Sequence, residues 1–388
     1  MMKTELKTVI SLDSFKGSLG SVEAGEAVRE GILRVFPDAD VSVFPLADGG
    51  EGTVDALTVG MGGELREVTV SDPLGRKISA GYGIVNSGNT AVIEMSAAAG
   101  LTLLKEDERD PMHTTTYGVG EIIKDAINTG CRDFIIGIGG SATNDCGIGM
   151  LQALGFGFPG DDGREVPYGA KGAGLVTEIR TDAVIKELKD CRFRVACDVN
   201  NPLFGENGAS LIYGPQKGAD DSMTKQMDSW LRQFSDIVKK YFPGADPGHP
   251  GAGAAGGMGF AFRTFLGGSL ERGIDIVMKE TGLEEHISEA DIIVTGEGRI
   301  DRQTAMGKAP IGVAGIAKKY GKTVIAFAGS IGEGAEECNA RGIDAFFPIV
   351  RQPGSLEQAI DPDNARRNLA DTAEQVFRML GCQGIKRS

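Results

Sequence analysis

The sequence has no long apolar run. Its 388 residues contain no stretch of the roughly 18 apolar residues that a membrane-spanning helix needs. The N-terminus, MMKTELKTVISLD, is too short and too polar for a secretory signal peptide. We therefore expect a cytoplasmic protein that does not cross a membrane.

Histidine, paired cysteine and basic charge are also scarce. The chain has three histidines, six cysteines and no C-x-x-C pair, so structural zinc and disulfide bonds are not expected. The net charge is −14, with acidic and basic residues interspersed. Such a chain has no basic patch for nucleic acid or for a membrane surface. We expect its partners to be small molecules.

Glycine, in contrast, is abundant. The chain has 58 glycines, whereas average usage of about 7% predicts about 27. Many of its loops must therefore need a positive φ or a close approach of the backbone to a ligand. The length suits about two or three domains, which can bury large cores without disulfides.

Both ends of the chain alternate strand and helix patterns. The N-terminal part predicts strands at residues 7–12 and 41–46, with a helix over 21–36 that Ser21 caps between them. The C-terminal part predicts strands over 291–295 and 323–328 and a final helix over 362–380. From about residue 64 the pattern changes to β-rich segments with turns. Helices are then expected over 116–128, 181–188 and 222–241.

These patterns predict an α/β protein with a discontinuous domain. We expect residues 1–65 and 285–388 to form one domain, and residues 66–284 to form a second α/β domain inserted into it. The loops that follow parallel strands then lie at one edge of each sheet, where ligands bind in open α/β folds.

The segment 290–320 shows this arrangement most clearly. A short strand is followed by a polar, glycine-rich loop and then by a helix that ends near Gly321. The loop carries Glu297, Arg299, Asp301, Gln303, Thr304 and Lys308. Charged side chains of this kind can hold phosphates and a metal ion. The alternative is a solvated connection whose charges face water.

Several common catalytic motifs are missing. No G-x-S-x-G or H-E-x-x-H occurs, and the closest match to a Walker A loop has Arg302 in place of its first glycine. Residues 137–142 fit G-x-G-x-x-A after a strand, but no clear second strand ending in an acid follows at the spacing that dinucleotide binding requires. The acidic and glycine-rich loops favour phosphoryl transfer by a kinase of another fold.

A set of ordered motifs resembles the bacterial type I glycerate kinases over nearly the whole chain. The motifs are DSFKGSL (13–19), ADGGEGT (47–53), IGGSATND (138–145), ACDVNNPL (196–203), YGPQKGA (213–219), PGAGAAGGMG (250–259), and TGEGRID with QTAMGKAP (295–310). The resemblance implies a flavodoxin-like, doubly wound domain with an inserted α/β domain. It also implies transfer of the γ-phosphoryl group of ATP to D-glycerate with Mg²⁺. One departure is Cys146, where the family commonly has glycine.

Roles for individual residues follow from their chemistry. The glycerate carboxylate needs a cation, for which Lys16 and Arg299 are the candidates; arginine gives bidentate geometry. An acid facing the reacting hydroxyl is expected at Asp13, Asp198 or Asp301. Any one of these residues can instead serve a turn or a helix cap.

Metal and phosphate ligands are assigned in the same way. Mg²⁺ prefers one or two carboxylates together with phosphate oxygens and water, and Asp48, Glu51 and Glu297 are the candidates. Phosphates are expected at the amides of Gly253, Gly256 and Gly257, with Lys217 or Lys308 as a point charge. Close helix packing through small residues is the alternative for these glycines.

Two other functions stay open from the residues alone. One is an NAD-dependent hydroxy-acid dehydrogenase that uses the Gly137 loop, and the other is a non-catalytic ligand-binding regulator on a kinase-like fold. The family favours the 2-position of glycerate as acceptor. Neither residues nor family decides the oligomeric state, so a homo-oligomer is also left open.

Overall fold

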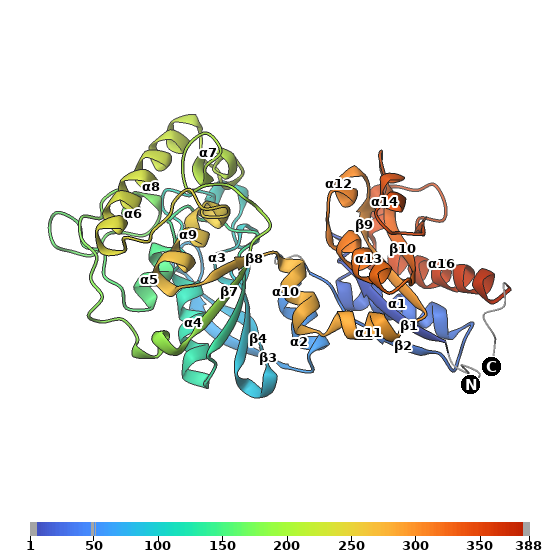
Figure 1. Cartoon of the computed structure of the whole chain (residues 1–388). Coiled ribbons are helices and arrows are strands. Elements are labelled where there is room, and N and C mark those ends of the chain that lie inside the picture. Colours follow the sequence, from blue (N-terminus) through green and yellow to red (C-terminus); the bar gives the residue numbers. More distant parts are fainter. Residues whose placement is uncertain (1–5, 48–49, 51, 383–388) are drawn as a thin grey trace. The chain divides into compact units, whose positions relative to one another are not determined.

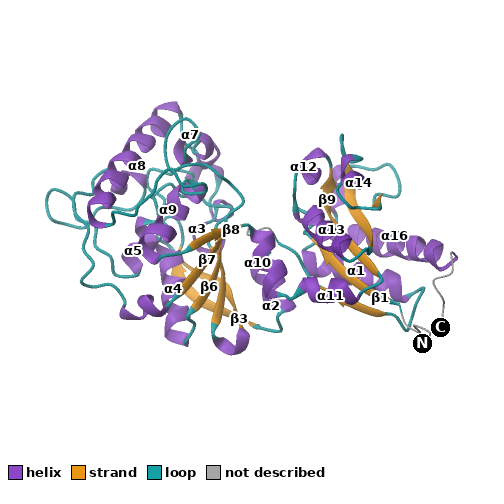
Figure 2. Cartoon of the chain, viewed as in Figure 1, coloured by secondary structure: helices purple, strands orange, loops and turns teal. Residues whose placement is uncertain are grey.

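The computed structural model describes residues 6–47, 50 and 52–382. The chain divides into two compact units. The terminal unit consists of Met1–Asp48, Asp55–Met61 and Val277–Ser388, and the middle unit consists of Gly49–Val54 and Gly62–Ile276. Each unit is built around its own β-sheet (Figures 1 and 2).

The sheet of the terminal unit has five parallel strands in the order β11-β10-β9-β1-β2. They are β1 (Lys7–Leu12), β2 (Asp40–Val43), β9 (Ile292–Ile300), β10 (Thr323–Ile331) and β11 (Ala345–Pro348). Read from the other edge, this is the flavodoxin-like order 2-1-3-4-5. The prediction that strands from both ends of the chain share a sheet is confirmed by the pairing of β1 with β9, which Figure 1 shows side by side.

Amphipathic helices cover both faces of this sheet with their apolar sides. On one face, α1 (Ser21–Leu33) and α16 (Pro362–Cys382) pack against alternate residues such as Ile10 and Val294. The residues between these, such as Val9 and Ile293, are also buried, and α13 packs against β9 and β10. The remaining helices of the unit are α11 (Leu283–Glu289), α12 (Arg302–Ala305), α13 (Ala309–Lys319), α14 (Glu337–Ala340) and α15 (Leu356–Ile360). The N-cap of α1 is Gly20, not Ser21 as predicted.

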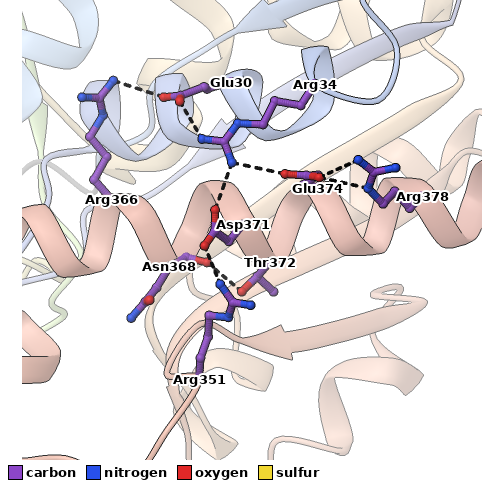
Figure 3. Close-up of polar contacts among 9 residues, drawn as sticks. All are labelled: Glu30, Arg34, Arg351, Arg366, Asn368, Asp371, Thr372, Glu374 and Arg378. Atoms are coloured by element: carbon purple, nitrogen blue, oxygen red, sulfur yellow. Dashed lines mark hydrogen bonds and ion pairs between the residues drawn. The ribbon is translucent and has the colours of Figure 1, made fainter.

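Helices α1 and α16 approach each other closely and share a network of charges. A Cβ atom on Gly31 would lie 2.2 Å from the carbonyl oxygen of Ala370, so glycine permits this crossing. Beside it, Arg34 contacts three carboxylates, at 2.7 Å from Glu30, 2.9 Å from Asp371 and 3.2 Å from Glu374. Figure 3 shows that three further arginines join the same carboxylates: Arg351, Arg366 and Arg378.

The sheet of the middle unit has six strands in sequence order, from β3 to β8. They are β3 (Glu64–Ser71), β4 (Lys77–Val85), β5 (Thr90–Glu94), β6 (Asp133–Gly137), β7 (Arg192–Ala196) and β8 (Ser269–Glu271). The strands from β3 to β5 pair antiparallel, whereas those from β5 to β8 pair parallel. The carboxyl ends of β5, β6 and β7 therefore lie at one edge.

The helices of the middle unit surround a large apolar core. They are α3 (Ser96–Ala99), α4 (Tyr117–Thr129), α5 (Ile148–Ala153), α6 (Ala170–Ala173), α7 (Ala209–Tyr213), α8 (Asp221–Tyr241) and α9 (Ala254–Leu266), with 3-10 turns at Asn86–Gly88, Leu101–Leu103, Glu106–Glu108, Lys186–Asp190 and Pro215–Lys217. Two helices, α2 (Thr53–Gly60) and α10 (Gly273–Glu280), span the sequence boundaries between the units.

The helix predicted over 181–188 is wrong. Only the 3-10 turn Lys186–Asp190 forms there. The amide of Ile185 donates to the carbonyl of Leu154 at 3.1 Å, so the backbone of this segment serves a tertiary contact that helix geometry would not permit.

Two further findings concern the cysteines and the lengths of the helices. All six cysteines are free thiols. Within residues 6–47, 50 and 52–382, every helix is either too short or too polar to span a bilayer.

Candidate functional site

The centre of the sheet in the terminal unit brings together loops from opposite ends of the chain. Strands β1 and β9 are parallel neighbours, and the amide of Asp13 donates to the carbonyl of Gly296 at 2.9 Å. A Cβ atom on Gly298 would lie only 3.3 Å from the Lys16 amide. In this strand order β1 and β9 form the topological switch point, where ligands of doubly wound sheets bind. The DSFKGSL and TGEGRID motifs therefore meet at this edge.

Strand β9 is longer than the sequence predicts. It continues through the glycine-rich segment to Ile300, because Arg299 and Ile300 still pair with Ser330 and Ile331 of β10. Glu297 and Arg299 therefore belong to a strand and not to a loop, which corrects the sequence-based expectation. Their side chains are held by sheet pairing, which fixes positions better than a free loop does.

Glu297 is the most buried acid at this edge. Its side chain is 9% exposed and lies 3.5 Å from the ammonium of Lys308. The hydroxyl of Thr304 donates to Glu297 Oε1 at 2.6 Å. Burial raises the pKa of Glu297 above its usual value, and the Thr304 hydrogen bond and the Lys308 charge oppose that rise.

Asp301 is the N-cap residue of the short helix α12. Its carboxylate accepts from the amide of Gln303 at 2.9 Å, and its own amide donates to the Thr304 hydroxyl at 3.1 Å. Arg299 Nε lies 3.2 Å from Asp301 Oδ2. Thr304 was not among the predicted site residues, although its D-x-x-T spacing from Asp301 resembles that of a capping box, in which the two residues cap each other.

The two cations at this edge are accessible. The Arg299 side chain is 65% exposed. Lys16 is exposed as well, and it makes no ion pair or hydrogen bond with the described part of the chain. Both side chains can therefore contact an anionic ligand without breaking a buried contact.

The other predicted acids of the N-terminal loops fall into two groups. Asp13 is half-buried at the end of β1, and its carboxylate accepts from the Ser14 amide at 2.7 Å. Asp48 and Glu51 lie outside the described residues. Asp13 thus combines a turn-forming contact with a position at the switch point.

Asp13, Glu297 and Asp301 offer carboxylate oxygen, the ligand type that Mg²⁺ prefers. Across residues 6–47, 50 and 52–382, no three His, Cys, Asp or Glu side chains form a ready metal cluster. Magnesium commonly takes one or two carboxylates and completes its shell with phosphate oxygens and water. The residues present therefore fit an ion that arrives with a phosphate ligand.

In the middle unit, polar residues follow β5, β6 and β7. Glu94 ends β5 and accepts from the Val54 amide at 2.8 Å, a contact that the sequence analysis missed. Asp198, after β7, accepts from the Gly273 amide at the start of α10 at 3.2 Å. For Asp198 the structure thus shows a helix-capping contact.

Lys217 does not lie on an open loop. It is 1% exposed, and its ammonium donates to Ser141 Oγ at 2.8 Å and to the Thr143 carbonyl at 2.6 Å. Its amine therefore points into the protein, toward the segment IGGSATND (138–145), and does not face solvent.

The glycines at the start of α9 are explained by close packing. Cβ atoms on Gly253 and Gly256 would lie 2.1 Å from the carbonyls of Pro202 and Thr143, respectively. The Gly253 amide already donates to Asn201 at 2.9 Å. Gly257 has φ +97°, and its Cβ would lie 2.9 Å from Cys146 Cα. These three positions are filled by protein, so packing alone accounts for glycine there.

Cys146 adopts the left-handed conformation that the family's glycine suggests. Its φ is +54°, and it is fully buried. Its amide donates to the carbonyl of Gly256 at 2.9 Å. The backbone therefore has a positive φ at this position, although the residue here is cysteine and not glycine.

The dinucleotide-binding alternative does not match the geometry. In that fingerprint the helix opens directly after the glycine loop, so that its N-terminus meets the pyrophosphate. Here β6 ends at Gly137, and α5 begins only at Ile148, after a segment that is mostly buried. The sequence match therefore lacks the structural context that it needs.

Comparisons with known proteins give a consistent result. The glycerate kinase family profile matches residues 8–381. The chain is 46% identical to a glycerate 2-kinase of Escherichia coli (strain K12) over 381 residues, which covers 97% of this chain and 100% of that protein. It is 45% identical to a glycerate kinase of Bacillus subtilis (strain 168) over 371 residues, 96% of this chain and 97% of the relative.

A solved structure agrees with these matches. The crystal structure of a proposed glycerate kinase 2 from Salmonella typhimurium LT2 superimposes with a TM-score of 0.89 at 43% identity, covering 98% of this chain and 99% of that one. The order of strands, the motifs that meet at the switch point and these matches over nearly the full length lead to one conclusion: the chain belongs to the glycerate kinase family.

Proposed function

We propose that this protein is an ATP-dependent glycerate kinase of the type I class. The hydroxyl oxygen of D-glycerate attacks the γ-phosphorus of ATP, the bond from that phosphorus to the bridging oxygen breaks, and ADP leaves. The hydroxyl proton passes to a carboxylate base, for which Asp301 is the preferred candidate. The 2-position is the favoured acceptor, which gives 2-phosphoglycerate. The observation that carries this proposal is the convergence of Asp13, Lys16, Arg299 and Asp301 at the β1–β9 switch point of a chain in this family.

Glycerate binding is assigned to the two exposed cations. Arg299 presents a planar fork that suits a carboxylate, and Lys16 adds a mobile point charge from the neighbouring loop. Because Arg299 Nε already contacts Asp301, a glycerate held by this arginine brings its hydroxyls near that acid. Asp301 is therefore the preferred candidate to position or deprotonate the hydroxyl, ahead of Asp13 and Asp198.

Magnesium and phosphates are assigned to the same edge. Glu297 would hold the ion; Asp48 and Glu51, which lie outside the described residues, are the other candidates from the sequence. When bound, Mg²⁺ neutralises phosphate charge during transfer. Lys308 is the N-cap of the eleven-residue helix α13, and a cation at a helix N-terminus favours phosphate binding there. Close packing explains Gly253, Gly256 and Gly257. Lys217 is buried and donates its hydrogen bonds to Ser141 and Thr143. These four residues are therefore not assigned to direct phosphate contact.

The wider setting is proposed on the same basis. The domain boundaries expected from the sequence, 1–65 plus 285–388 and 66–284, lie a few residues beyond the compact units, which change at Met61 and at Ile276. The partners are ATP and D-glycerate, with no role for nucleic acid or membranes, and the location is the cytoplasm.

A coupled assay for ADP tests the function. ADP release is expected to need glycerate and to stop when EDTA removes the divalent metal. Phosphorus NMR of the product then identifies the phosphorylated hydroxyl. Equal ADP release without glycerate would refute the acceptor. Reduction of NAD with glycerate would instead support the dehydrogenase, and glycerate binding without turnover would support the regulator.

A further inference from the structure

The loop between β10 and α14 adds a third segment of chain to the edge where β1 and β9 meet. Figure 1 shows α12 and α14, the helices that follow β9 and β10, side by side. The Gly332 amide donates to the Ile300 carbonyl at 2.8 Å, and the Arg302 amide donates to the Glu333 carbonyl at 3.0 Å. Asp301 lies between the two residues that make these bonds. The backbone of Gly332 is therefore held beside Asp301.

The same loop also packs against Arg302. A Cβ atom on the buried Gly334 would lie 2.8 Å from the Cβ atom of Arg302. Arg302 Nε lies 3.0 Å from Glu337 Oε1, and Arg302 Nη2 lies 3.7 Å from Glu333 Oε1. Exposed ion pairs of this kind contribute little by themselves. The backbone hydrogen bonds and the close packing therefore fix the position of the loop.

Gly332 lies directly against the pair formed by Arg299 and Asp301. A Cβ atom on Gly332 would lie 2.8 Å from Asp301 Cβ and 2.9 Å from both Nε and Nη2 of Arg299. These distances are repulsive, because non-bonded carbon atoms in contact normally lie about 3.5–4.0 Å apart. Arg299 Nε is also the atom that lies 3.2 Å from Asp301 Oδ2. A side chain at position 332 would therefore take the space of the group that contacts the acid.

The backbone conformation does not explain the glycine at position 332. Gly332 is not among the glycines with positive φ, whereas Gly334 in the same loop has a φ of +79°. A negative φ does not by itself require glycine. The space taken by the Arg299 guanidinium and by Asp301 is therefore the feature that a side chain at position 332 would disturb.

We propose that Gly332 is a positioning residue of the glycerate site. Because it lacks a side chain, it leaves room for the Arg299 guanidinium beside Asp301, and it thereby sets where the glycerate carboxylate binds. This inference rests on the proposed function, in which Arg299 binds that carboxylate and Asp301 faces the reacting hydroxyl. Gly332 acts only through Arg299 and takes no part in the chemistry.

The two neighbours of Gly332 differ in how easily they move. Asp301 is held at the N-cap of α12, where its carboxylate accepts from the Gln303 amide at 2.9 Å. The Arg299 side chain, in contrast, is 65% exposed and ends a long flexible chain. A methyl group at position 332 is therefore expected to move the guanidinium toward solvent and away from Asp301. A glycerate carboxylate bound by this arginine would move with it, and its hydroxyls would leave the acid.

Gly332→Ala tests this role in the full-length protein. In the coupled assay for ADP, KM for glycerate is expected to rise about 10-fold or more, with KM for ATP little changed. Gly315→Ala is the matched control. Gly315 is an exposed residue of α13, and a Cβ atom there would meet nothing within 4 Å. This control is expected to keep the kinetics of the wild type.

A double-mutant cycle with Arg299→Ala separates positioning from a merely structural role. Arg299→Ala removes both nitrogens that a methyl group at position 332 would meet, and it is expected to raise KM for glycerate by itself. In this background, Gly332→Ala is expected to change KM for glycerate by less than about 2-fold, because the group that it displaces is gone. A glycine that served only the fold would have the same effect in both backgrounds.

The outcomes separate this inference from the proposed function. A rise in KM for glycerate that disappears in the Arg299→Ala background supports the inference. A KM near that of the wild type for Gly332→Ala overturns it, as does an equal rise in both backgrounds. An unchanged KM for Arg299→Ala also overturns it, because this arginine would then not bind glycerate. If the wild type shows no glycerate-dependent ADP release, the kinase function itself is refuted and the inference falls with it.

Urea unfolding covers the case in which Gly332→Ala does not fold. If the double variant with Arg299→Ala folds, the clash is with the guanidinium, which supports the inference. If the double variant also fails to fold, Gly332 serves the backbone next to Asp301, and the inference is overturned.

Discussion

Arg299 Nε lies 3.2 Å from Asp301 Oδ2, although Arg299 belongs to β9 and Asp301 is the N-cap residue of α12. The acid also caps its helix through the Gln303 amide. Asp301 is therefore held from two sides while its neighbour Arg299 stays largely exposed. This arrangement fixes an acid next to the cation that is proposed to bind the glycerate carboxylate, so a bound glycerate would have its hydroxyls near Asp301.

Two replacements of Asp301 distinguish its role as a helix cap from its role as a charged base. Asn keeps the size and the helix cap, so Asp301→Asn should fold with near wild-type stability, whereas Asp301→Ala should lose about 1 kcal/mol. Both variants should lower kcat by about 10²-fold or more, because neither can act as a base. Steady-state kinetics and urea unfolding measure the two effects. A near wild-type kcat for Asp301→Asn would place the base elsewhere, at Asp13 first.

Lys16→Ala should act on substrate binding. Lys16 is exposed and makes no ion pair with the described residues, so its loss should leave the fold intact. If it holds the glycerate carboxylate, KM for glycerate should rise by about 10-fold or more, with KM for ATP little changed. Lys225→Ala is the control for removal of an exposed lysine. Equal kinetics for the two variants would count against the assignment of Lys16.

Cys146 allows a test of the left-handed backbone. In the middle of a helix or strand, a protein with alanine is more stable than one with glycine by about 0.5–1 kcal/mol. At φ +54° the order should reverse, because a Cβ costs about 1 kcal/mol or more in this region. We expect Cys146→Gly to unfold at higher denaturant than Cys146→Ala. The two variants share the loss of the thiol, so their difference reports the Cβ atom alone; the ordinary order would show that the turn relaxes.

The charges between α1 and α16 should be weak and sensitive to salt (Figure 3). The Arg34 side chain is 38% exposed, so Arg34→Met should lower the free energy of unfolding by about 1 kcal/mol or less at low salt. In 1 M NaCl this loss should largely disappear. Gly31→Ala is the contrast, since its Cβ would overlap the Ala370 carbonyl and should cost about 1–3 kcal/mol at any salt. A loss for Arg34→Met that does not change with salt would point to packing by its side chain.

Lys217 should make stability depend on pH in a defined direction. Its pKa is lowered to about 7 in the folded state, against about 10.4 in an unfolded chain. Between these pH values the unfolded state binds more protons at this residue, so the unfolding free energy rises with pH by up to about 1.4 kcal/mol per unit. Lys217→Met lacks this contribution. The difference between wild type and variant, measured in urea at pH 7, 8 and 9, should therefore grow in favour of the wild type; a constant difference would contradict the lowered pKa.

The sequence by itself determined the class of fold and most of its elements. Local patterns predicted the strand at 7–12 and the helices at 116–128 and 222–241 close to their observed bounds, because alternation and helical spacing are properties of short windows. The ordered motifs indicated the family, which the comparisons confirm. The alternation of strands and helices at both ends of the chain also predicted that the loops after the strands 7–12 and 291–295 lie at one edge of the same sheet.

Tertiary structure decided what long-range pairing and burial control. Pairing with β10 extends β9 through a glycine-rich segment that local propensity reads as a loop. Lys217 reads as a free cation in sequence, but its long side chain reaches inward to carbonyl and hydroxyl oxygens. The α9 glycines read as a phosphate loop in the sequence, whereas close contacts with Pro202 and with residues 143–146 account for them. In each case the contacting residue is far away in the sequence. A short stretch of sequence therefore does not include the interaction that determines the structure.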